Sequence, residues 1–412
     1  MPTVLIWVIS LASLVLMLAR PRGISEYVWI CLGALLLVVT RLLPARAALH
    51  AVGQGLDVYL FLTGMMLLAE LAREEGVFDW VADLAVRHAR GSPRRLFVGV
   101  YLVGIAVTAL LSNDATAVVL TPAVLAAVRR ARVEPRPHLL ACAMIANAAS
   151  FVLPISNPAN LVVFHSNLPT LGHWIRLFIL PSIAAIGATF VCLRVLLRGS
   201  LAGEVAREEE SVGLSAAGGM ALAGIALAVA VLLTASGLGI RLGAPTCLAG
   251  VVTMGLVALK DRRAPRAAVR QVSWSVLPLV AGLFVIVEAL NRAGLLRMTR
   301  EALLGLAAAH DGVGNFAGGF GIGLLSNAMN NLPAGLAAGT ALGEIGQHGL
   351  LAHAVLLGVD LGPNLSVTGS LATILWLIAL RREKAEITGW EFLKIGVVAM
   401  PVALALALAA LR

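Results

Sequence analysis

Apolar residues occur along this chain in long runs that short polar loops separate. Many of these runs come close to the ~20 residues that a helix needs to cross a bilayer. We predict spanning helices over residues 3–19, 27–44, 56–73, 138–164, 173–198, 215–236, 243–260, 273–290, 353–380 and 391–411. The pattern therefore predicts an all-α polytopic membrane protein, in which the first apolar run is a retained spanning helix.

Two further apolar regions, 96–128 and 311–343, are interrupted at their centres by Ser-Asn pairs. Each is long enough for two short helices that return to the side from which they entered, so we predict two re-entrant hairpins. The spans 138–164 and 353–380 carry Pro, Gly and Asn at mid-length, which predicts a broken helix in each. Non-helical backbone at that depth requires a covering of protein or water.

The charges of the loops predict an orientation. With both hairpins re-entrant, most Lys and Arg residues fall on one side, which the positive-inside rule makes cytoplasmic. Both termini then lie outside, in the periplasm of a bacterial inner membrane. Arg292, Arg297 and Arg300 fall on the wrong side of this prediction.

Five spans in each half make the second half insert upside down, so the chain is predicted to be two inverted repeats. The first covers 1–198 and the second 215–412, and a charged cytoplasmic linker, 199–214, joins them. Sequence similarity supports this division, because Gly64, Glu70 and Gly76 recur as Gly282, Glu288 and Gly294, each 218 positions later. Opposite loop charge around matching sequence is what an inverted repeat predicts.

The two hairpins are aligned through their Ser-Asn pairs. LLSNDATAVVLTP at 110–122 is set against LLSNAMNNLPAGL at 324–336, which places Ala328 opposite Asp114. A weaker match sets 147–163 against 360–376.

Composition agrees with a membrane protein. Apolar residues make up 59% of the 412 residues and charged residues 13%, against roughly a quarter charged in soluble domains. The net charge of +9 is explained by basic cytoplasmic loops facing anionic lipid, so no nucleic acid is predicted as a partner.

Four polar clusters lie inside apolar segments, where unsatisfied polar groups cost several kcal/mol. Helices broken at mid-membrane expose N–H groups and C=O groups that, with side-chain amides and hydroxyls, can bind a solute. The two hairpin tips and two broken helices are expected to enclose one site at the repeat interface. The predicted substrate-binding residues are Ser112, Asn113, Thr116, Ser156, Asn157, Asn160, Ser326, Asn327, Asn330, Asn331, Ser366, Thr368 and Ser370.

Asp114 is the sharpest candidate among the ionisable residues. A carboxylate inside a membrane is functional by default, so we expect Asp114 at the first hairpin tip to gain and lose a proton in each cycle. Asp360 is the second candidate for proton coupling. Glu70 and Glu288 recur in both halves, and for them a structural role beside arginines at helix ends is as consistent with the sequence as a functional one.

The sequence does not indicate an enzyme. It contains no catalytic triad, P-loop or metal-binding motif, and its four cysteines are scattered. We therefore predict no cofactor and no metal.

At the polar clusters the chain resembles the ion transporter (IT) superfamily, and in particular the ArsB-type arsenite/antimonite efflux pumps. The resemblance rests on SNDATAVVLTP at 112–122, ANAASFVLPISNPANLVVF at 146–164, SNAMNNLPAGL at 326–336 and GVDLGPNLSVTGSLATILWL at 358–377. It implies an elevator-type fold and efflux of arsenite and antimonite in exchange for protons. It also implies that a soluble arsenite-stimulated ATPase is a partner in some members.

The residues at the breaks bear on the substrate. As(OH)3 is neutral and presents three hydroxyls, which suits a cage of Asn, Ser and Thr, whereas a dicarboxylate favours a basic residue and none lies near the breaks. The residue that directly follows each Ser-Asn pair is Asp114, Pro158 or Ala328, unlike the Ser-Asn-Thr of sodium-coupled dicarboxylate carriers. A sodium/proton antiporter or an organic-anion carrier of the same superfamily stays open as the alternative.

Overall fold

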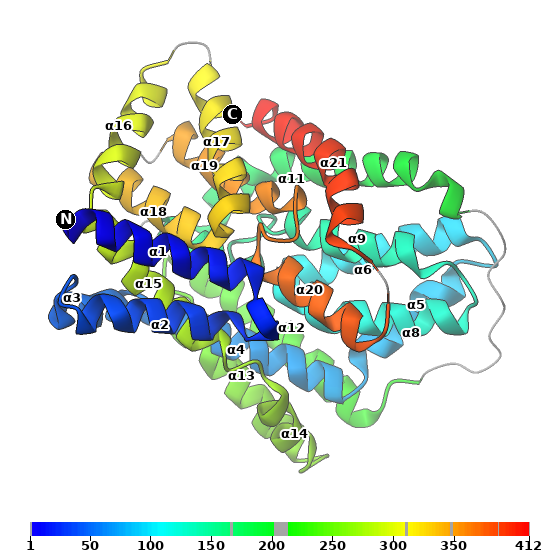
Figure 1. The fold of residues 1–412 in the computed structure, drawn as a ribbon. Helices are drawn as coiled ribbons and strands as arrows, with labels where there is room; N and C mark the ends of the chain where they lie inside the picture. The colour runs from blue at the N-terminus through cyan, green and yellow to red at the C-terminus, as the bar shows by residue number, and fades with distance from the viewer. Residues whose placement is uncertain are drawn as a thin grey trace.

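The computed structural model describes residues 2–164, 168–201, 213–309, 312–346, 349–385 and 387–411 (Figure 1). All regular structure in these residues is helical. The predicted linker 199–214 lies largely outside the described residues, so its cytoplasmic placement stays a prediction.

The first half begins with two apolar helices and continues through a break in each predicted position. Its helices are α1 (Pro2–Ala19), α2 (Glu26–Val39), α3 (Ala45–Gln54), α4 (Leu56–Glu74), α5 (Val77–His88), α6 (Pro93–Leu110), α7 (Asn113–Ala115), the π-helix η2 (Thr116–Leu120), α8 (Thr121–Arg130), α9 (Pro135–Ala148), α10 (Pro158–Phe164) and α11 (Leu171–Leu196). Short 3-10 turns lie at Pro21–Gly23, Pro154–Ser156 and Arg198–Leu201.

The second half repeats this order. Its helices are α12 (Ala216–Gly237), α13 (Gly243–Ala258), α14 (Ala264–Gln271), α15 (Val276–Arg292), α16 (Leu295–Ala307), α17 (Val313–Met329), α18 (Asn331–Glu344), α19 (Leu350–Leu361), α20 (Leu371–Arg382) and α21 (Gly389–Ala409). A 3-10 turn at Gly362–Asn364 ends α19.

The spacing of the helices confirms the repeat. Helices α5, α7 and α11 begin 218 positions before α16, α18 and α21, respectively. Gly76 and Gly294, one such pair, both adopt positive φ (70° and 106°) just before α5 and α16. The left-handed region is the natural one for glycine, which explains why glycine occupies this position in both halves.

This register corrects the alignment of the two hairpins. The first hairpin breaks just before Asn113 and the second just before Asn331, so Ser112 corresponds to Asn330 and Asp114 to Leu332. Ser326 and Asn327 lie within α17, before the break. The two Ser-Asn pairs have the same sequence, but the first lies at its break and the second lies before its break. Ala328 is therefore not the counterpart of Asp114.

Both re-entrant hairpins are present. The rings of Phe97, near the start of α6, and His138, near the start of α9, lie 6.1 Å apart, and α8 leads directly into α9. The two outer ends of the first hairpin therefore lie on one side. In the second hairpin the start of α17 approaches the start of α19, since a Cβ on Gly318 would lie 2.8 Å from Leu351 Cδ1.

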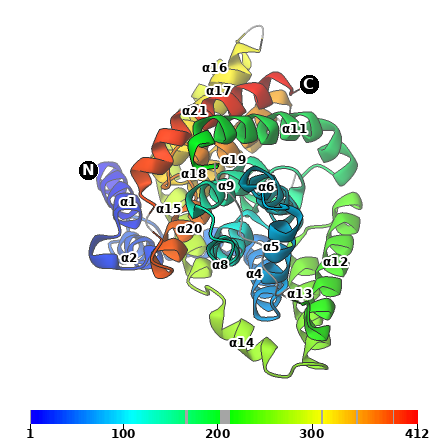
Figure 2. The same cartoon turned by 90° about the vertical axis from the view of Figure 1, so that its right-hand side faces the viewer.

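The halves are interlocked. Helix α2 packs along α15 of the other half, and its counterpart α13 packs along α4. A Cβ on Gly64 would lie 2.3 Å from the carbonyl oxygen of Thr246, so α4 and α13 pack with backbones almost touching. Helices α11 and α21 also pack against each other (Figure 2). These contacts make the repeats one body rather than two adjacent domains.

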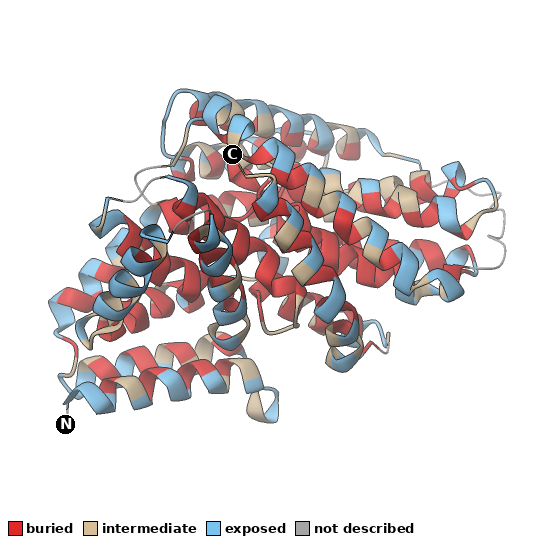
Figure 3. Ribbon diagram, turned by 90° about the horizontal axis from the view of Figure 1, so that it is seen from above, coloured by how far each residue is buried: buried red, intermediate tan, exposed pale blue. Residues whose placement is uncertain are grey.

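Large apolar side chains are exposed on the outer surface, and polar residues are buried among apolar ones at the centre. Seen from above, buried residues fill the middle helices and exposed residues lie at the edges (Figure 3). Exposed large apolar side chains occur on peripheral helices, with Val39 68% exposed on α2 and Leu248 64% exposed on α13. Exposed apolar area on this scale is typical of a surface that faces lipid.

Length and apolarity identify six described helices that can cross a membrane, or seven if the pair α3 and α4, bent by 48°, counts as one span. Helices α2, α13 and α19 are apolar but shorter. Each predicted broken span consists of two helices that are individually too short to cross a membrane, so helix length does not identify these spans. Four short helices that hydropathy did not predict, α3, α5, α14 and α16, fill the loops on either side of α4 and α15.

Candidate functional site

The four breaks converge on one small cavity, which we name the central cavity. Its volume is about 270 Å³, and it is lined by Leu62, Asn113, Asp114, Asn157, Pro158, Val276, Asn331, Leu332, Ser370, Leu371 and Ala372. Both hairpin tips and both broken helices contribute, as predicted. Helices α4 and α15 add Leu62 and Val276, which the sequence reasoning missed because they lie in uninterrupted apolar runs.

The first hairpin tip presents Asn113 and Asp114. Ser112 is extended (φ −175°) and caps the following helix, because its Oγ accepts a hydrogen bond from Ala115 N at 3.1 Å. Asn113 Oδ1 accepts a hydrogen bond from Asp114 N at 2.9 Å. The side chains thus satisfy N–H groups that the break leaves free. Thr116 turns away from the cavity and hydrogen-bonds Thr108 Oγ1 at 2.8 Å across the two limbs.

The second hairpin tip turns through Asn330, which has a positive φ of 76°. Asn330 Oδ1 accepts a hydrogen bond from Leu332 N at 3.3 Å, so Asn330 caps α18 as Ser112 caps the first tip. Asn331 lines the central cavity, and its backbone N–H donates to Gly369 O at 2.9 Å. That bond joins the tip to the second broken helix.

The two broken helices are joined across the repeats by a symmetric pair of hydrogen bonds. Asn157 Nδ2 donates to Asp360 Oδ1 at 2.7 Å, and Ser370 Oγ donates to Asn147 Oδ1 at 3.3 Å. Asn157 and Ser370 each stand just before a half-helix, and Asn147 and Asp360 each stand near the end of the preceding one. Asp360 therefore acts on the cavity through Asn157, and Asn147 was missed because nothing local marks it.

A second polar cluster holds the second hairpin to its broken helix. Asn327 Nδ2 donates to Gly323 O and Gly362 O at 2.8 and 2.9 Å, while Asn327 Oδ1 accepts from Ser366 Oγ at 2.7 Å. Thr368 Oγ1 donates to Asn327 O at 3.0 Å. These three predicted residues hydrogen-bond one another and do not line the central cavity. A direct contact with substrate stays a prediction for them.

The remaining predicted residues tie the cavity walls to the backbone. Ser156 Oγ donates to Ala109 O at 3.0 Å, which holds the first break against α6. Asn160 Nδ2 donates to Ser150 O at 3.0 Å and so closes the loop between α9 and α10. Ser326 Oγ donates to Ile322 O within its own helix. In this conformation these side chains hold the backbone around the central cavity and do not line it.

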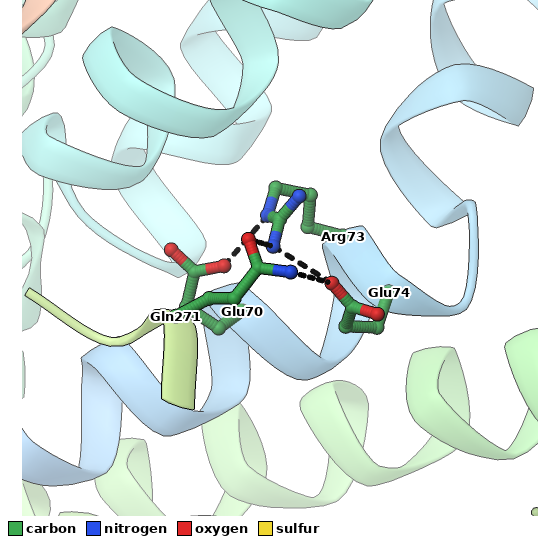
Figure 4. A network of polar contacts seen from close by, with 4 residues as sticks. All are labelled: Glu70, Arg73, Glu74 and Gln271. Carbon is green, nitrogen blue, oxygen red and sulfur yellow. Dashed lines mark hydrogen bonds and ion pairs between the residues drawn. The ribbon is translucent and has the colours of Figure 1, made fainter. Parts of the chain in front are cut away.

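A larger cavity, which we name the Glu70 cavity, leads from the site to the end of α4. It has a volume of about 560 Å³ and shares Leu62, Asp114, Pro158 and Val276 with the central cavity. At its other end lies Glu70, which Arg73 Nε contacts at 2.6 Å. Arg73 also contacts Glu74 at 2.8 Å, and Gln271 of α14 completes this network (Figure 4).

Glu288 occupies the equivalent position in the second half. Arg292 Nε contacts Glu288 Oε1 at 2.7 Å, so both repeated glutamates pair with an arginine about one turn further along the same helix. Both glutamates therefore lie beside arginines near helix ends, and a purely structural role for them stays a prediction.

The charge of the central cavity is simple. Among the described residues that line it, Asp114 is the one ionisable group, and Asn113, Asn157, Asn331 and Ser370 are the neutral polar ones. Four helical segments, α7, α10, α18 and α20, begin at this cavity. The lining therefore offers neutral donors and acceptors around one carboxyl group. The four cysteines lie on four different helices and do not converge.

Comparison with known proteins identifies relatives along nearly the whole chain. A family model described as citrate transporter, CitMHS, matches residues 5–359. An arsenical pump membrane protein of Escherichia coli is 27% identical over 98% of this chain and 97% of its own length, and one of Yersinia enterocolitica is 29% identical over 84% of each. An uncharacterized transporter of Mycobacterium tuberculosis is 26% identical over 87% of this chain and 86% of its own length.

Among solved structures, the YdaH transporter of Alcanivorax borkumensis, described as having an unusual topology, matches this fold. The TM-score is 0.59 at 17% identity, and the match covers 93% of this chain and 96% of that one. The two chains therefore share a fold over nearly their whole lengths.

Proposed function

The chain belongs to the citrate transporter family CitMHS, and we propose that this multi-pass membrane transporter exports arsenite and antimonite in exchange for protons. The observation that carries the proposal is the lining of the central cavity, in which neutral amide and hydroxyl groups surround one carboxyl group. The curated relatives named as arsenical pump membrane proteins support the choice of substrate. We further propose that the membrane is the bacterial inner membrane, with both termini outside.

The chemistry of As(OH)3 suits this lining. The solute is uncharged at neutral pH and has three hydroxyl groups, each able to donate one hydrogen bond and accept others. The amide and hydroxyl side chains of the lining supply the matching partners. Recognition by neutral groups avoids burying an unpaired charge, which is expensive inside a membrane.

Asp114 is the group proposed to couple transport to protons. When its carboxylate is ionised, it accepts hydrogen bonds from the hydroxyls of the substrate. When it is protonated, it loses much of its acceptor capacity and the substrate is released. Because Asp114 also lines the Glu70 cavity, substrate that enters through this cavity and a proton that leaves through it pass the same carboxyl group.

The test is expression in arsenite-sensitive cells, followed by proteoliposome assays of arsenite-driven proton movement. We expect the wild-type protein to lower accumulated arsenic and Asp114→Asn to abolish this. Asp79→Asn, on α5 outside both cavities, is the matched carboxylate control and should retain export. Unchanged arsenic in cells that contain well-expressed wild-type protein would sink the proposal.

The description of the family model favours an organic anion as the second candidate. A citrate-like substrate would place its carboxylates next to Asp114, and the described lining supplies no Lys, Arg or His to balance them. This candidate therefore requires Asp114 to stay protonated while the anion is bound. Citrate uptake by the wild-type protein, without any effect of arsenite, and citrate binding that Asp114→Asn retains, would favour it over arsenite export.

A further inference from the structure

A third cavity lies at the end of α15, away from the central cavity. We name it the Glu288 cavity. It has a volume of about 790 Å³ and is lined by Gln54, Phe284, Val287, Glu288, Asn291, Arg292, Leu296, Leu336, Thr340 and Glu344. The cavity does not share a described lining residue with the other two. The function proposed above assigns it no role.

The Glu288 cavity is the repeat counterpart of the Glu70 cavity. Four residues that line the Glu70 cavity recur 218 positions later among those that line the Glu288 cavity. The pairs are Met66 with Phe284, Ala69 with Val287, Glu70 with Glu288, and Val118 with Leu336. Ser273, which precedes α15, lines the Glu70 cavity, and Gln54, which precedes α4, lines the Glu288 cavity. With the same shift of 218 positions, these two residues correspond to within one residue. Two unrelated surface hollows would not show this correspondence.

The two cavities lie at opposite ends of an antiparallel pair of helices. The end of α4 meets α14, where Arg73 contacts Gln271 at the segment that leads into α15. The end of α15 meets α3, because Glu288 and Gln54 line the same cavity and α3 leads into α4. Helices α4 and α15 therefore run in opposite directions (Figure 1). The inverted repeat thus places one cavity towards each side of the membrane.

The cavities differ in depth. The Glu70 cavity reaches Ser112 and Asp114 at the first hairpin tip. Their counterparts, Asn330 and Leu332, are absent from the described lining of the Glu288 cavity, which ends at Leu336. Phe284 is only 5% exposed and stands where the first half has the half-buried Met66. In this conformation one pathway is open to the site and its counterpart is closed just below it.

We propose that the Glu288 cavity is the mouth of the transport pathway on the opposite side of the membrane. Substrate passes through it when the second hairpin takes the position against α15 that the first hairpin has against α4. The described lining combines Asn291 and Thr340 with the Glu288–Arg292 ion pair, which suits a small hydrated solute. The proposal rests on transport by this site, but not on the identity of arsenite as the substrate.

The experiment measures access to the central cavity from each side, without a substrate. Asn331→Cys is placed in a chain in which the four native cysteines are replaced by Ala, and a membrane-impermeant maleimide is applied to spheroplasts or to inverted vesicles. Thr340→Trp narrows the Glu288 cavity, and Ser273→Trp, the matched control, narrows the Glu70 cavity. Both positions are half-buried and polar.

We expect Thr340→Trp to slow labelling from the Glu288 side at least tenfold and to leave labelling from the other side within twofold. Ser273→Trp should give the reverse pattern, and labelling from the unblocked side reports that each variant is folded. Labelling that Thr340→Trp slows from both sides, or from neither, overturns the proposal. The proposal is also overturned if Asn331→Cys never reacts from the Glu288 side. Arsenite export by cysteine-free chains is measured in parallel. If export is absent but labelling still depends on the side as expected, the result contradicts arsenite as the substrate and not the pathway through the Glu288 cavity.

Discussion

The two hairpin tips have equivalent helix caps and different chemistry. Ser112 and Asn330 each cap the helix that follows the break, and Asn113 and Asn331 each line the central cavity. The next residue is Asp114 in the first tip and Leu332 in the second. The broken helices show the opposite assignment, since the carboxyl group Asp360 lies in the second half and its counterpart Asn147 is an amide. The two halves thus have matching backbone elements, but the first half has its carboxyl group at the hairpin tip and the second half has its carboxyl group at the broken helix.

The largest effect is expected from making the two tips alike. Asp114→Leu removes the one ionisable group from the described lining of the central cavity, so proton movement driven by arsenite in proteoliposomes should fall at least tenfold. Leu332→Ile, at the counterpart position, should keep most of the activity because it alters shape and not charge. Equal losses in the two variants would show that the site depends on packing at the tips and that the asymmetry is incidental.

The cross-repeat hydrogen bonds offer a second comparison. Asp360→Leu leaves Asn157 Nδ2 without its acceptor in a buried position, which costs about 1–3 kcal/mol. Ser370→Ala, at the counterpart of Asn157, removes the longer bond to Asn147 and also the bond by which Ser370 Oγ caps Thr373 N at the start of α20. The loss of such a cap costs about 0.5–2 kcal/mol, so we expect a loss of stability of similar size to that of Asp360→Leu. Thermal unfolding in detergent measures both. Asp360→Asn should stay near wild type, because an amide oxygen can still accept from Asn157.

Two equivalent glycines should differ in their tolerance of alanine. A Cβ on Gly64 would lie 2.3 Å from the backbone carbonyl of Thr246, whereas on Gly282 the nearest atom is the movable Ile30 Cγ2 at 2.7 Å. Gly64→Ala must separate α4 from α13, and overpacking of this kind costs about 1–3 kcal/mol. Gly282→Ala should cost less than Gly64→Ala in the same thermal unfolding assay. The reverse order would mean that α2 and α15 are packed more rigidly than α4 and α13.

The fold could be predicted from the sequence much further than the site. Long apolar runs, loop charge and the breaks at Pro, Gly and Asn depend on local sequence, so the spans, hairpins and inverted repeat could be predicted. Short amphipathic helices such as α5 and α16 carry charges and are too short for a hydropathy signal. The register of the hairpins was predicted wrongly because the alignment followed the identical Ser-Asn pairs. The sequence does not show where each helix breaks, and the breaks are what correspond in the structure.

The contacts that shape the site join residues far apart in the chain. Asn157 and Asp360 are 203 positions apart, and the local sequence around either residue does not predict the other as its partner. The sequence therefore predicted that polar residues gather at the breaks, but not which of them would line the cavity. Asn327, Ser366 and Thr368 have the same composition as a binding shell and instead satisfy one another.

The smallest effect is expected at the repeated glutamates. Glu70 is 11% exposed and belongs to a network of four residues, whereas Glu288 is 28% exposed and its partner Arg292 is 50% exposed. Exposed ion pairs contribute about 0–1 kcal/mol because water and salt screen them, so Glu288→Gln should barely change the thermal unfolding midpoint. Glu70→Gln should lower it more, since Arg73 then keeps only Glu74 as a charged partner. If both variants lower the midpoint equally, the network around Arg73 adds nothing to the single pair, and the two ends of the repeat are alike in stability as well as in geometry.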